Sequence, residues 1–206
     1  MSFMPAFHVF RAEAEIIGRL LAGYGELEYI MAMCLGSALA DEATAIRTLY
    51  RMKGERLTVA DSLLFPLCEQ NGLAGPYTAA SGGMRHCARI RNQFAHCNWD
   101  YSPSHGLFFV DLLESAKSSI AYKHEWKHID CALLNRHEEF FWNTVLWWEL
   151  IRNNFIEIRK GRTIPSCEEP KRLLQPPLYN PQDEHIPPWI SLDSAVPEPN
   201  IPPEAE

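Results

Sequence analysis

The sequence predicts an all-α fold: a bundle of four to five helices, with a small β-hairpin before the last long helix and a proline-rich C-terminal tail. Two observations lead to this prediction. Apolar residues recur at the i, i+3, i+4 spacing of amphipathic helices through most of residues 12–160. Of the 15 prolines, 11 lie beyond residue 162, and proline propagates neither helix nor sheet. We therefore divide the chain into a helical domain, residues 1–162, and an extended tail, residues 163–206.

The first half of the helical domain contains three predicted helices. The first spans residues 12–39, and Gly18, Gly23 and Gly25 predict a kink or a division near Tyr24. Asp41 has the residue type and the position of an N-cap for a shorter helix that ends near Tyr50. A further helix follows over about residues 55–69.

In the second half of the domain, the helical spacing of apolar residues is interrupted by one β segment. A break at residues 72–76 precedes a helix over residues 79–96. Turn residues followed by an apolar run within residues 98–112 predict a small hairpin, and residues 118–123 are compatible with one more short strand. The apolar stripe then resumes and predicts the longest helix, about residues 130–160.

The tail is expected to be extended and to contact the helical domain only in patches, with Leu178, Tyr179, Trp189 and Ile190 as anchor points. Its last dozen residues combine prolines with like charges, which is typical of disorder.

Charge is distributed unevenly along the chain. The net charge is −7, and the tail, with eight acidic and two basic residues, accounts for −6 of it. The overall balance disfavours a broad nucleic-acid-binding surface. The helical domain is nevertheless close to neutral, so a local basic cleft is compatible with it.

Cysteine usage and hydropathy predict a cytoplasmic protein. None of the six cysteines forms a C-x-x-C pair, and several occupy apolar helical positions, which favours reduced thiols. The sequence shows no signal-peptide pattern and no uninterrupted apolar run of about 20 residues, so we expect no membrane span.

The stretch HEWKH, residues 124–128, matches the zinc-protease pattern H-E-x-x-H. On a helix, His124 and His128 would bind one zinc and Glu125 would act as the base, with Glu149 at about the distance of a third ligand. Lys127, however, would place a charge in a segment that a zinc site requires to be buried. The motif also lies where the start of the predicted helix is uncertain. We therefore interpret it as a solvated helix start and expect neither a metal nor a cofactor.

The stretch RIRNQFAHCNWD, residues 89–100, has a different chemistry. Asn92 and His96 are four residues apart and share a helix face, and Arg91 borders that face from the side, about 140° round the axis. An imidazole exchanges protons near neutral pH, and a guanidinium holds a phosphate in a planar fork. These are the groups needed to cleave RNA without a metal. Arg85, Arg89 and Trp99 are the candidate substrate-binding residues beside them.

Two other interpretations remain open at this point. Arg, Asn and His at the end of a helix also cap backbone carbonyls and interact favourably with the helix dipole. Aromatic residues at helical spacing could instead form a docking surface of a plain interaction domain: Trp142, Trp147, Trp148 and Trp189. Such residues are more often core or dimer interface.

The stretch Arg91-Asn92-Gln93-Phe94-Ala95-His96 resembles the R-x4-H signature of the HEPN superfamily, in its form Arg-Asn-x-x-Ala-His. The surrounding helix order over residues 12–160 is similar too. The stretch YGELEYIMAMCL, residues 24–35, resembles the early helix of these proteins, and AIRTLYRMKGERLTVADSLL resembles their second helical pair.

The resemblance implies a helical homodimer with two signatures in one cleft. Many such proteins are metal-independent endoribonucleases of toxin–antitoxin or other defence systems, so RNA is the implied substrate and a cognate antitoxin a candidate partner. The catalytic pair maps onto Arg91 and His96, with Asn92 as the polar residue after the arginine, and Glu26 or Glu28 as a loosely mapped acidic helper. Some members are non-catalytic modules that bind a nucleotide or a partner protein, which is the alternative function here. Asn98 stands where one subgroup has a modified tyrosine.

Overall fold

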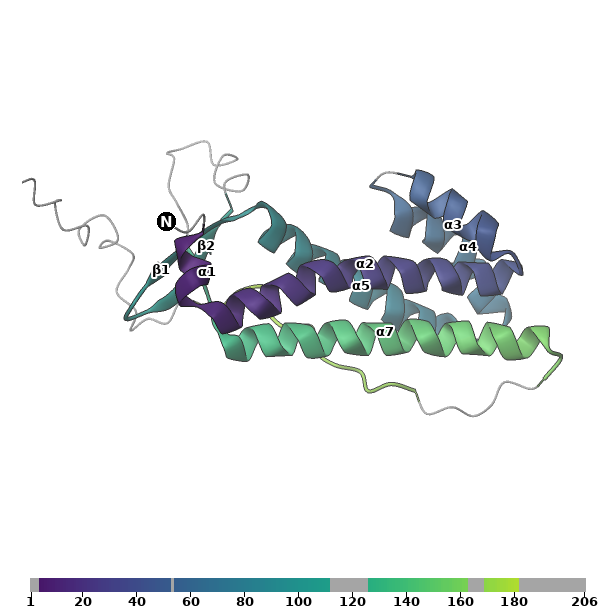
Figure 1. Cartoon of the computed structure of the whole chain (residues 1–206). Helices are drawn as coiled ribbons and strands as arrows, with labels where there is room; N and C mark the ends of the chain where they lie inside the picture. The colour runs from purple at the N-terminus through teal and green to yellow at the C-terminus, as the bar shows by residue number, and fades with distance from the viewer. Residues whose placement is uncertain (1–3, 53, 112–125, 163–168, 182–206) are drawn as a thin grey trace, which may run out of the picture.

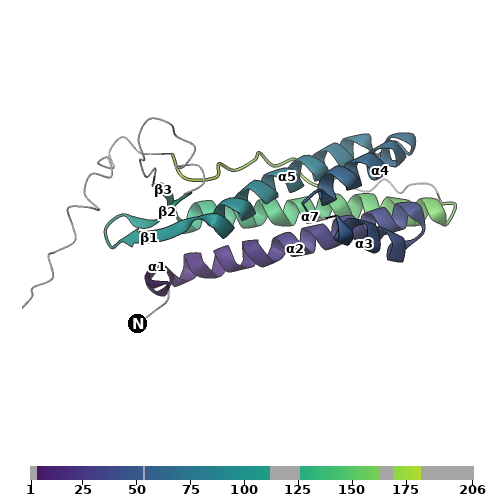
Figure 2. The ribbon, with the colours of Figure 1, turned by 90° about the horizontal axis from the view of Figure 1, so that it is seen from above.

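Three long helices form the body of the protein. The computed structural model describes residues 4–52, 54–111, 126–162 and 169–181, and the fold is given for these. Helices α2 (Arg11–Leu39) and α7 (Cys131–Arg159) run parallel and share the most extensive interface, while α5 (Ala74–His96) runs antiparallel to both (Figures 1 and 2). The predicted helical bundle is therefore observed.

Smaller elements close the two ends of this body. Helices α3 (Glu42–Arg51) and α4 (Arg56–Gln70) pack at one end, against α2 and α5. The short helix α1 (Pro5–Val9), which the sequence analysis did not predict, packs at the other end against α2 and β1. None of the helices in the described part of the chain is both long and apolar enough to cross a membrane.

Helix α2 is continuous from Arg11 to Leu39, so the expected division near Tyr24 is wrong. A helical glycine costs only about 1 kcal/mol relative to alanine, and packing against α7 along the helix offsets this cost. Gly23 lies directly opposite Phe141 of α7: a Cβ on it would be 3.9 Å from that ring.

Helix α5 begins at Ala74, five residues earlier than predicted. Gly72, with φ of 73°, ends the preceding helix in the left-handed conformation that glycine tolerates. Pro76 is the third residue of α5, in the first turn, where the backbone N–H has no helical partner to lose. The predicted break is therefore reduced to the three residues between Gln70 and Ala74.

Side-chain caps begin two of the helices. Asp41 accepts a hydrogen bond from the Thr44 amide at 2.9 Å, which confirms it as the N-cap of α3. Asp130 accepts one from the Leu133 amide at 2.8 Å and caps α7 in the same way.

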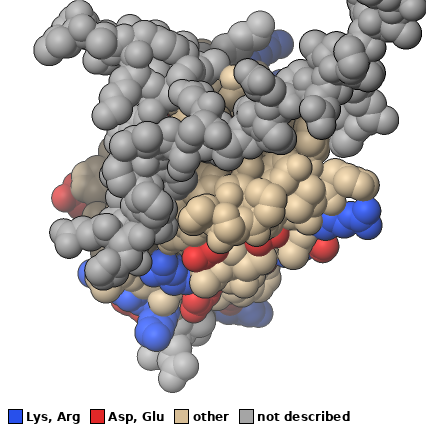
Figure 3. Space-filling model, turned by 90° about the vertical axis from the view of Figure 1, so that its left-hand side faces the viewer, with Lys and Arg blue, Asp and Glu red and all other residues tan. Residues whose placement is uncertain are grey.

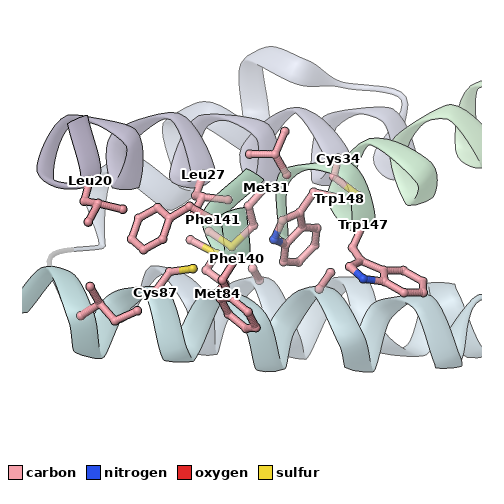
Figure 4. Close-up of a cluster of buried hydrophobic side chains, with 14 of the residues drawn as sticks. Leu20, Leu27, Met31, Cys34, Met84, Cys87, Phe140, Phe141, Trp147 and Trp148 are labelled. Atoms are coloured by element: carbon pink, nitrogen blue, oxygen red, sulfur yellow. The ribbon is translucent and has the colours of Figure 1, made fainter. Parts of the chain in front are cut away.

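The core lies where α2, α5 and α7 meet (Figure 4). Trp148 is fully buried and meets Tyr77 edge to face at 5.8 Å between ring centroids. Trp147 is buried as well, so these two tryptophans are not part of a docking surface. Trp142 is 62% exposed, and Trp189 lies outside the described residues.

A three-stranded antiparallel sheet, in the order β1-β2-β3, follows α5. The predicted hairpin is β1 (Asn98–Ser102) with β2 (Gly106–Val110), and β3 (Lys127–Ile129) adds to β2. His128 is therefore a strand residue, opposite Phe108, and the helical zinc-binding form of HEWKH is not present at it. His124 and the strand suggested at residues 118–123 lie outside the described part of the chain.

Beyond α7, residues 172–180 form an extended segment, which we call the C-terminal strap. It runs back along α5 and α7 (Figure 2), and Leu178 and Tyr179 pack against the core as expected of anchor points. Ile190, the remaining predicted anchor, lies outside the described residues, as does the end of the chain.

Hydrogen-bond donors of the helices hold the strap. The Nε2 atoms of His86 and His137 donate to the carbonyl oxygens of Pro176 and Pro177, at 2.8 and 2.7 Å. Gln93 adds a bond of 2.9 Å from Nε2 to the next carbonyl, that of Leu178. Buried carbonyls require donors, and side chains of α5 and α7 supply three in a row.

Both histidines are held neutral. Burial, together with the nearby His86 and Arg136 and against the opposing effect of the bond to Pro177, lowers the pKa of His137 to about 4. Burial and Arg89 lower the pKa of His86 against the raising effect of its bond to Pro176. Protonation would be unfavourable at both rings: Nδ1 of His137 is buried without a partner, and Nδ1 of His86 accepts from Arg89 at 2.8 Å.

The first prediction concerns pH. A histidine whose pKa is lowered by folding binds its proton more readily in the unfolded chain, so stability is lost as pH falls below the unfolded value. For His137 the window runs from roughly pH 6.5 down to about pH 4. Urea unfolding across this window should show a falling free energy of unfolding, with up to about 3 kcal/mol from this ring. His137→Gln keeps a donor but does not titrate, and its profile should be flatter; an equally steep profile would contradict the assignment.

The second prediction uses two adjacent glycines of α5. A Cβ on Gly83 would lie 2.7 Å from Oγ1 of Thr144, whereas one on Gly82 would meet nothing within 4 Å. Gly83→Ala should therefore lower the free energy of unfolding by about 1–3 kcal/mol through overpacking. Gly82→Ala should raise it by about 0.5–1 kcal/mol through helix propensity. Thermal unfolding of both variants measures this, and equal shifts of the melting temperature would contradict the close approach of α5 to α7.

Candidate functional site

The R-x4-H stretch occupies the last two turns of α5. Asn92 and His96 are exposed and Arg91 is half-buried, with its Nη1 donating to Oδ1 of Asn92 at 2.9 Å. His96 is the last residue of the helix, and within the described part of the chain it has no hydrogen-bond or ion-pair partner. Its imidazole is therefore available to a ligand.

Buried neighbours determine which way these side chains face. Phe94 is buried in contact with other aromatic rings, and Gln93 is buried beneath the strap. With these residues turned inward, Asn92 and His96 face solvent.

Arg91 borders helix α2 instead. Its positive charge acts on the hydroxyl of Tyr24, whose pKa is raised to about 12, mainly by burial and then by the charge of Glu28. Arg91 and Arg56 oppose that rise. Tyr24 therefore stays protonated near neutral pH and can donate a hydrogen bond beside Arg91. Tyr24 is not among the site residues predicted from the sequence, although it stands four residues before Glu28 on the same helix face.

The two candidate acidic helpers separate in the structure. Glu28 forms an ion pair with Arg56 of α4, whose guanidinium carbon lies 4.8 Å from the ring centre of Tyr50. Glu26 lines a groove between α2 and α7. Glu28 is thus the acidic residue on the Arg91 side, and its charge is already paired.

Arg85 is engaged within the chain. It forms an ion pair with Asp61 of α4 and a hydrogen bond to the hydroxyl of Ser81. Asp61 also accepts from Ser81 at 2.8 Å and from the hydroxyl of Tyr77 at 2.5 Å. This network joins α4 to α5.

Arg89 is engaged with the strap. Its Nη2 donates to Nδ1 of His86 at 2.8 Å and to Oε1 of Gln175 at 3.1 Å. Arg89 thereby connects α5 to the strap and supports the histidine that holds Pro176.

Trp99 is half-buried within an aromatic cluster. Its ring centre lies 5.1 Å from that of Phe7, 5.3 Å from Phe109 and 5.7 Å from Phe94. These contacts join α1, α5 and the sheet, so Trp99 contributes to packing at this end of the molecule.

At the end of the molecule that carries the sheet, the visible surface has both positive and negative side chains. Figure 3 shows blue and red side chains interspersed along the lower edge of that face.

The described residues hold no group of three or more His, Cys, Asp or Glu side chains that could bind a metal ion. His128 of the HEWKH stretch has Nδ1 3.1 Å from Nδ2 of Asn180 in the strap. Desolvation lowers the pKa of His128 against the opposing charge of Asp130.

Chemically, one chain presents half of an acid–base site. His96 can take or give a proton, Arg91 can stabilise an anion, and Asn92 and Tyr24 can donate hydrogen bonds. On a helix, positions five apart are separated by about 140° and about 7.5 Å along the axis. Arg91 and His96 of one helix therefore point in different directions, and the helix geometry alone does not place a phosphate bound by Arg91 next to His96 of the same chain.

The third prediction tests the role of Trp99. Trp99→Ala should lower the free energy of unfolding by about 3 kcal/mol, because it removes a ring that packs against three others. Trp99→Phe should retain most of the stability. Trp142→Ala is the matched control, since that ring is 62% exposed and its loss should change little. Urea unfolding of the three variants measures this contribution to stability. Unchanged stability of Trp99→Ala would contradict a packing role and leave this ring available for binding alone.

No family model, no curated protein and no solved structure matches this chain. Its own residues therefore carry the functional argument, above all the exposed Asn92 and His96 beside Arg91.

Proposed function

We propose that this protein is a HEPN-like, metal-independent endoribonuclease, in which His96 acts as acid or base and Arg91 stabilises the reacting phosphate. The observation that carries the proposal is the exposed imidazole of His96 at the end of α5, on the face of Asn92 and bordered by Arg91, with no partner among the described residues. A cap or core histidine would instead be bonded within the chain, as His86 is through both of its ring nitrogens.

The proposed reaction is a transesterification. A neutral imidazole takes the proton of the ribose 2′-OH, and the oxygen attacks the adjacent phosphorus. The bond to the 5′-oxygen breaks, and an imidazolium returns a proton to that leaving oxygen. The products are a 2′,3′-cyclic phosphate and a 5′-hydroxyl, and no metal takes part in the proposed steps. Arg91 stabilises the charge on the phosphate oxygens through its planar fork.

A homodimer is part of the proposal. The reaction uses a base and an acid, and each R-x4-H stretch supplies one imidazole. A two-fold axis near the ends of two α5 helices would bring both His96 side chains to one groove, with Arg91 of either chain beside the phosphate. Light scattering of the purified protein should show a dimer at micromolar concentration.

A role as a toxin or defence effector, with a cognate antitoxin as partner, extends the proposal by the HEPN resemblance. A cytoplasmic location fits the thiols: Cys34, Cys68 and Cys87 are free and buried. Burial raises the pKa of Cys68 and Cys87 to about 12, which keeps them protonated and unreactive.

The fourth prediction concerns RNA cleavage by purified protein in EDTA. His96→Ala should reduce the rate by about 10²–10⁴-fold, the contribution of a positioned acid or base. Arg91→Lys should also be impaired, because lysine keeps the charge but loses the fork. Melting temperatures should be unchanged for His96→Ala, since the imidazole is exposed. His105→Ala, at another exposed histidine in the β1–β2 turn, is the matched control and should cleave normally.

Mixed subunits test the shared site. Refolding the wild type with an equal amount of His96→Ala gives about one quarter wild-type dimers, so a groove that needs both imidazoles should keep about a quarter of the wild-type activity, whereas about half would show that each chain acts alone. A fully active His96→Ala protein would end the nuclease proposal. Tight RNA binding without cleavage by the wild type would point to the non-catalytic alternative.

A further inference from the structure

A cavity of about 410 Å³ lies on a different part of α5 from the R-x4-H stretch. The first turns of α5, the middle of α7 and the beginning of the strap enclose it. Its volume falls within the range of small-molecule sites, about 300–1,000 Å³.

Small residues of α5 leave this space open. Gly75, Ala79 and Gly82 line the cavity and lie on one face of the helix. A Cβ on Gly82 would meet nothing within 4 Å, and one on Gly75 would lie 3.9 Å from Nη2 of Arg172. The backbone of α5 is therefore accessible to a flat ligand on this face.

The opposite wall is apolar with a few polar groups. Phe140 and Trp147 of α7 contribute aromatic surface, and Figure 4 shows both projecting from that helix. Asn143 adds an amide, and Gln175 of the strap adds another. A mostly apolar pocket with a few convergent polar groups is typical of a ligand site.

Arg172 sets the charge of the cavity. Among the described residues that line the cavity it is the one with a charged side chain, and none of the others is acidic. Within the described part of the chain, Arg172 has no hydrogen-bond or ion-pair partner. A guanidinium at the edge of an apolar space favours a carboxylate, sulfonate or phosphate group.

We propose that this cavity binds a small aromatic anion. Its planar body would lie between the glycine face of α5 and the rings of Phe140 and Trp147, and its acidic group would pair with Arg172. Because Arg172 and Gln175 belong to the strap, the bound anion also links the strap to α5. The proposal is independent of the nuclease proposal and uses none of its residues.

The fifth prediction uses two fluorescent probes of the same shape. 8-Anilinonaphthalene-1-sulfonate is an aromatic anion, and N-phenyl-1-naphthylamine is its neutral counterpart. Arg172→Gln should weaken binding of the anion by about tenfold, as expected for a lost charge-assisted contact, and leave the neutral probe unchanged. Lys171→Gln, which removes the neighbouring cation outside the cavity lining, is the matched control and should alter neither.

A second pair of variants tests the cavity itself. Gly82→Leu should fill the space and weaken both probes, whereas Gly25→Leu, at an exposed glycine of α2, should weaken neither. Near-ultraviolet circular dichroism shows that each variant is folded, since the anionic probe also binds partly folded chains. If Gly82→Leu does not fold, the comparison of Arg172→Gln with Lys171→Gln still decides the outcome. Absence of anion binding by the wild type, or binding insensitive to Arg172→Gln, overturns the proposal.

Discussion

The orientation of α5 about its own axis is the constraint on which the rest of the structure depends. Gly83 allows this helix to approach Thr144 of α7 so closely that a Cβ would lie 2.7 Å from its hydroxyl oxygen. Once that contact and the buried ring of Phe94 fix the rotation of α5, the helix geometry determines the direction of its other side chains. Arg91 borders α2, His96 faces solvent, and His86 faces the strap.

The strap depends on the same orientation. Its prolines can donate no hydrogen bonds, and its carbonyls reach the domain only because His86, Gln93 and His137 present donors along one groove. Burial keeps both histidines neutral, which leaves each ring with one donor and one acceptor nitrogen. A segment without secondary structure of its own thereby becomes a wall of the cavity beside Arg172.

The basic and aromatic residues at positions 85–99 are close in sequence but have different structural roles. Arg85 joins α4 to α5 through Asp61, Arg89 supports the strap, and Trp99 packs at the sheet end. What remains directed at solvent is Asn92 and His96, with Arg91 at the border. The proposed site is therefore smaller than the basic cluster in the sequence, and Tyr24 of α2 adds a donor to it.

The helical period, the Asp41 cap, the hairpin and the extended course of residues 172–180 followed from the sequence by itself, because each depends on neighbours within a few residues. The continuity of α2 and the early start of α5 did not, since packing outweighs the modest helix cost of glycine. The third strand at His128 likewise depends on pairing with β2, which lies distant in sequence. Spacing placed Asn92 and His96 on one face, but only the tertiary structure decided which charges are paired, because the partners Asp61, Gln175 and Arg56 come from other elements.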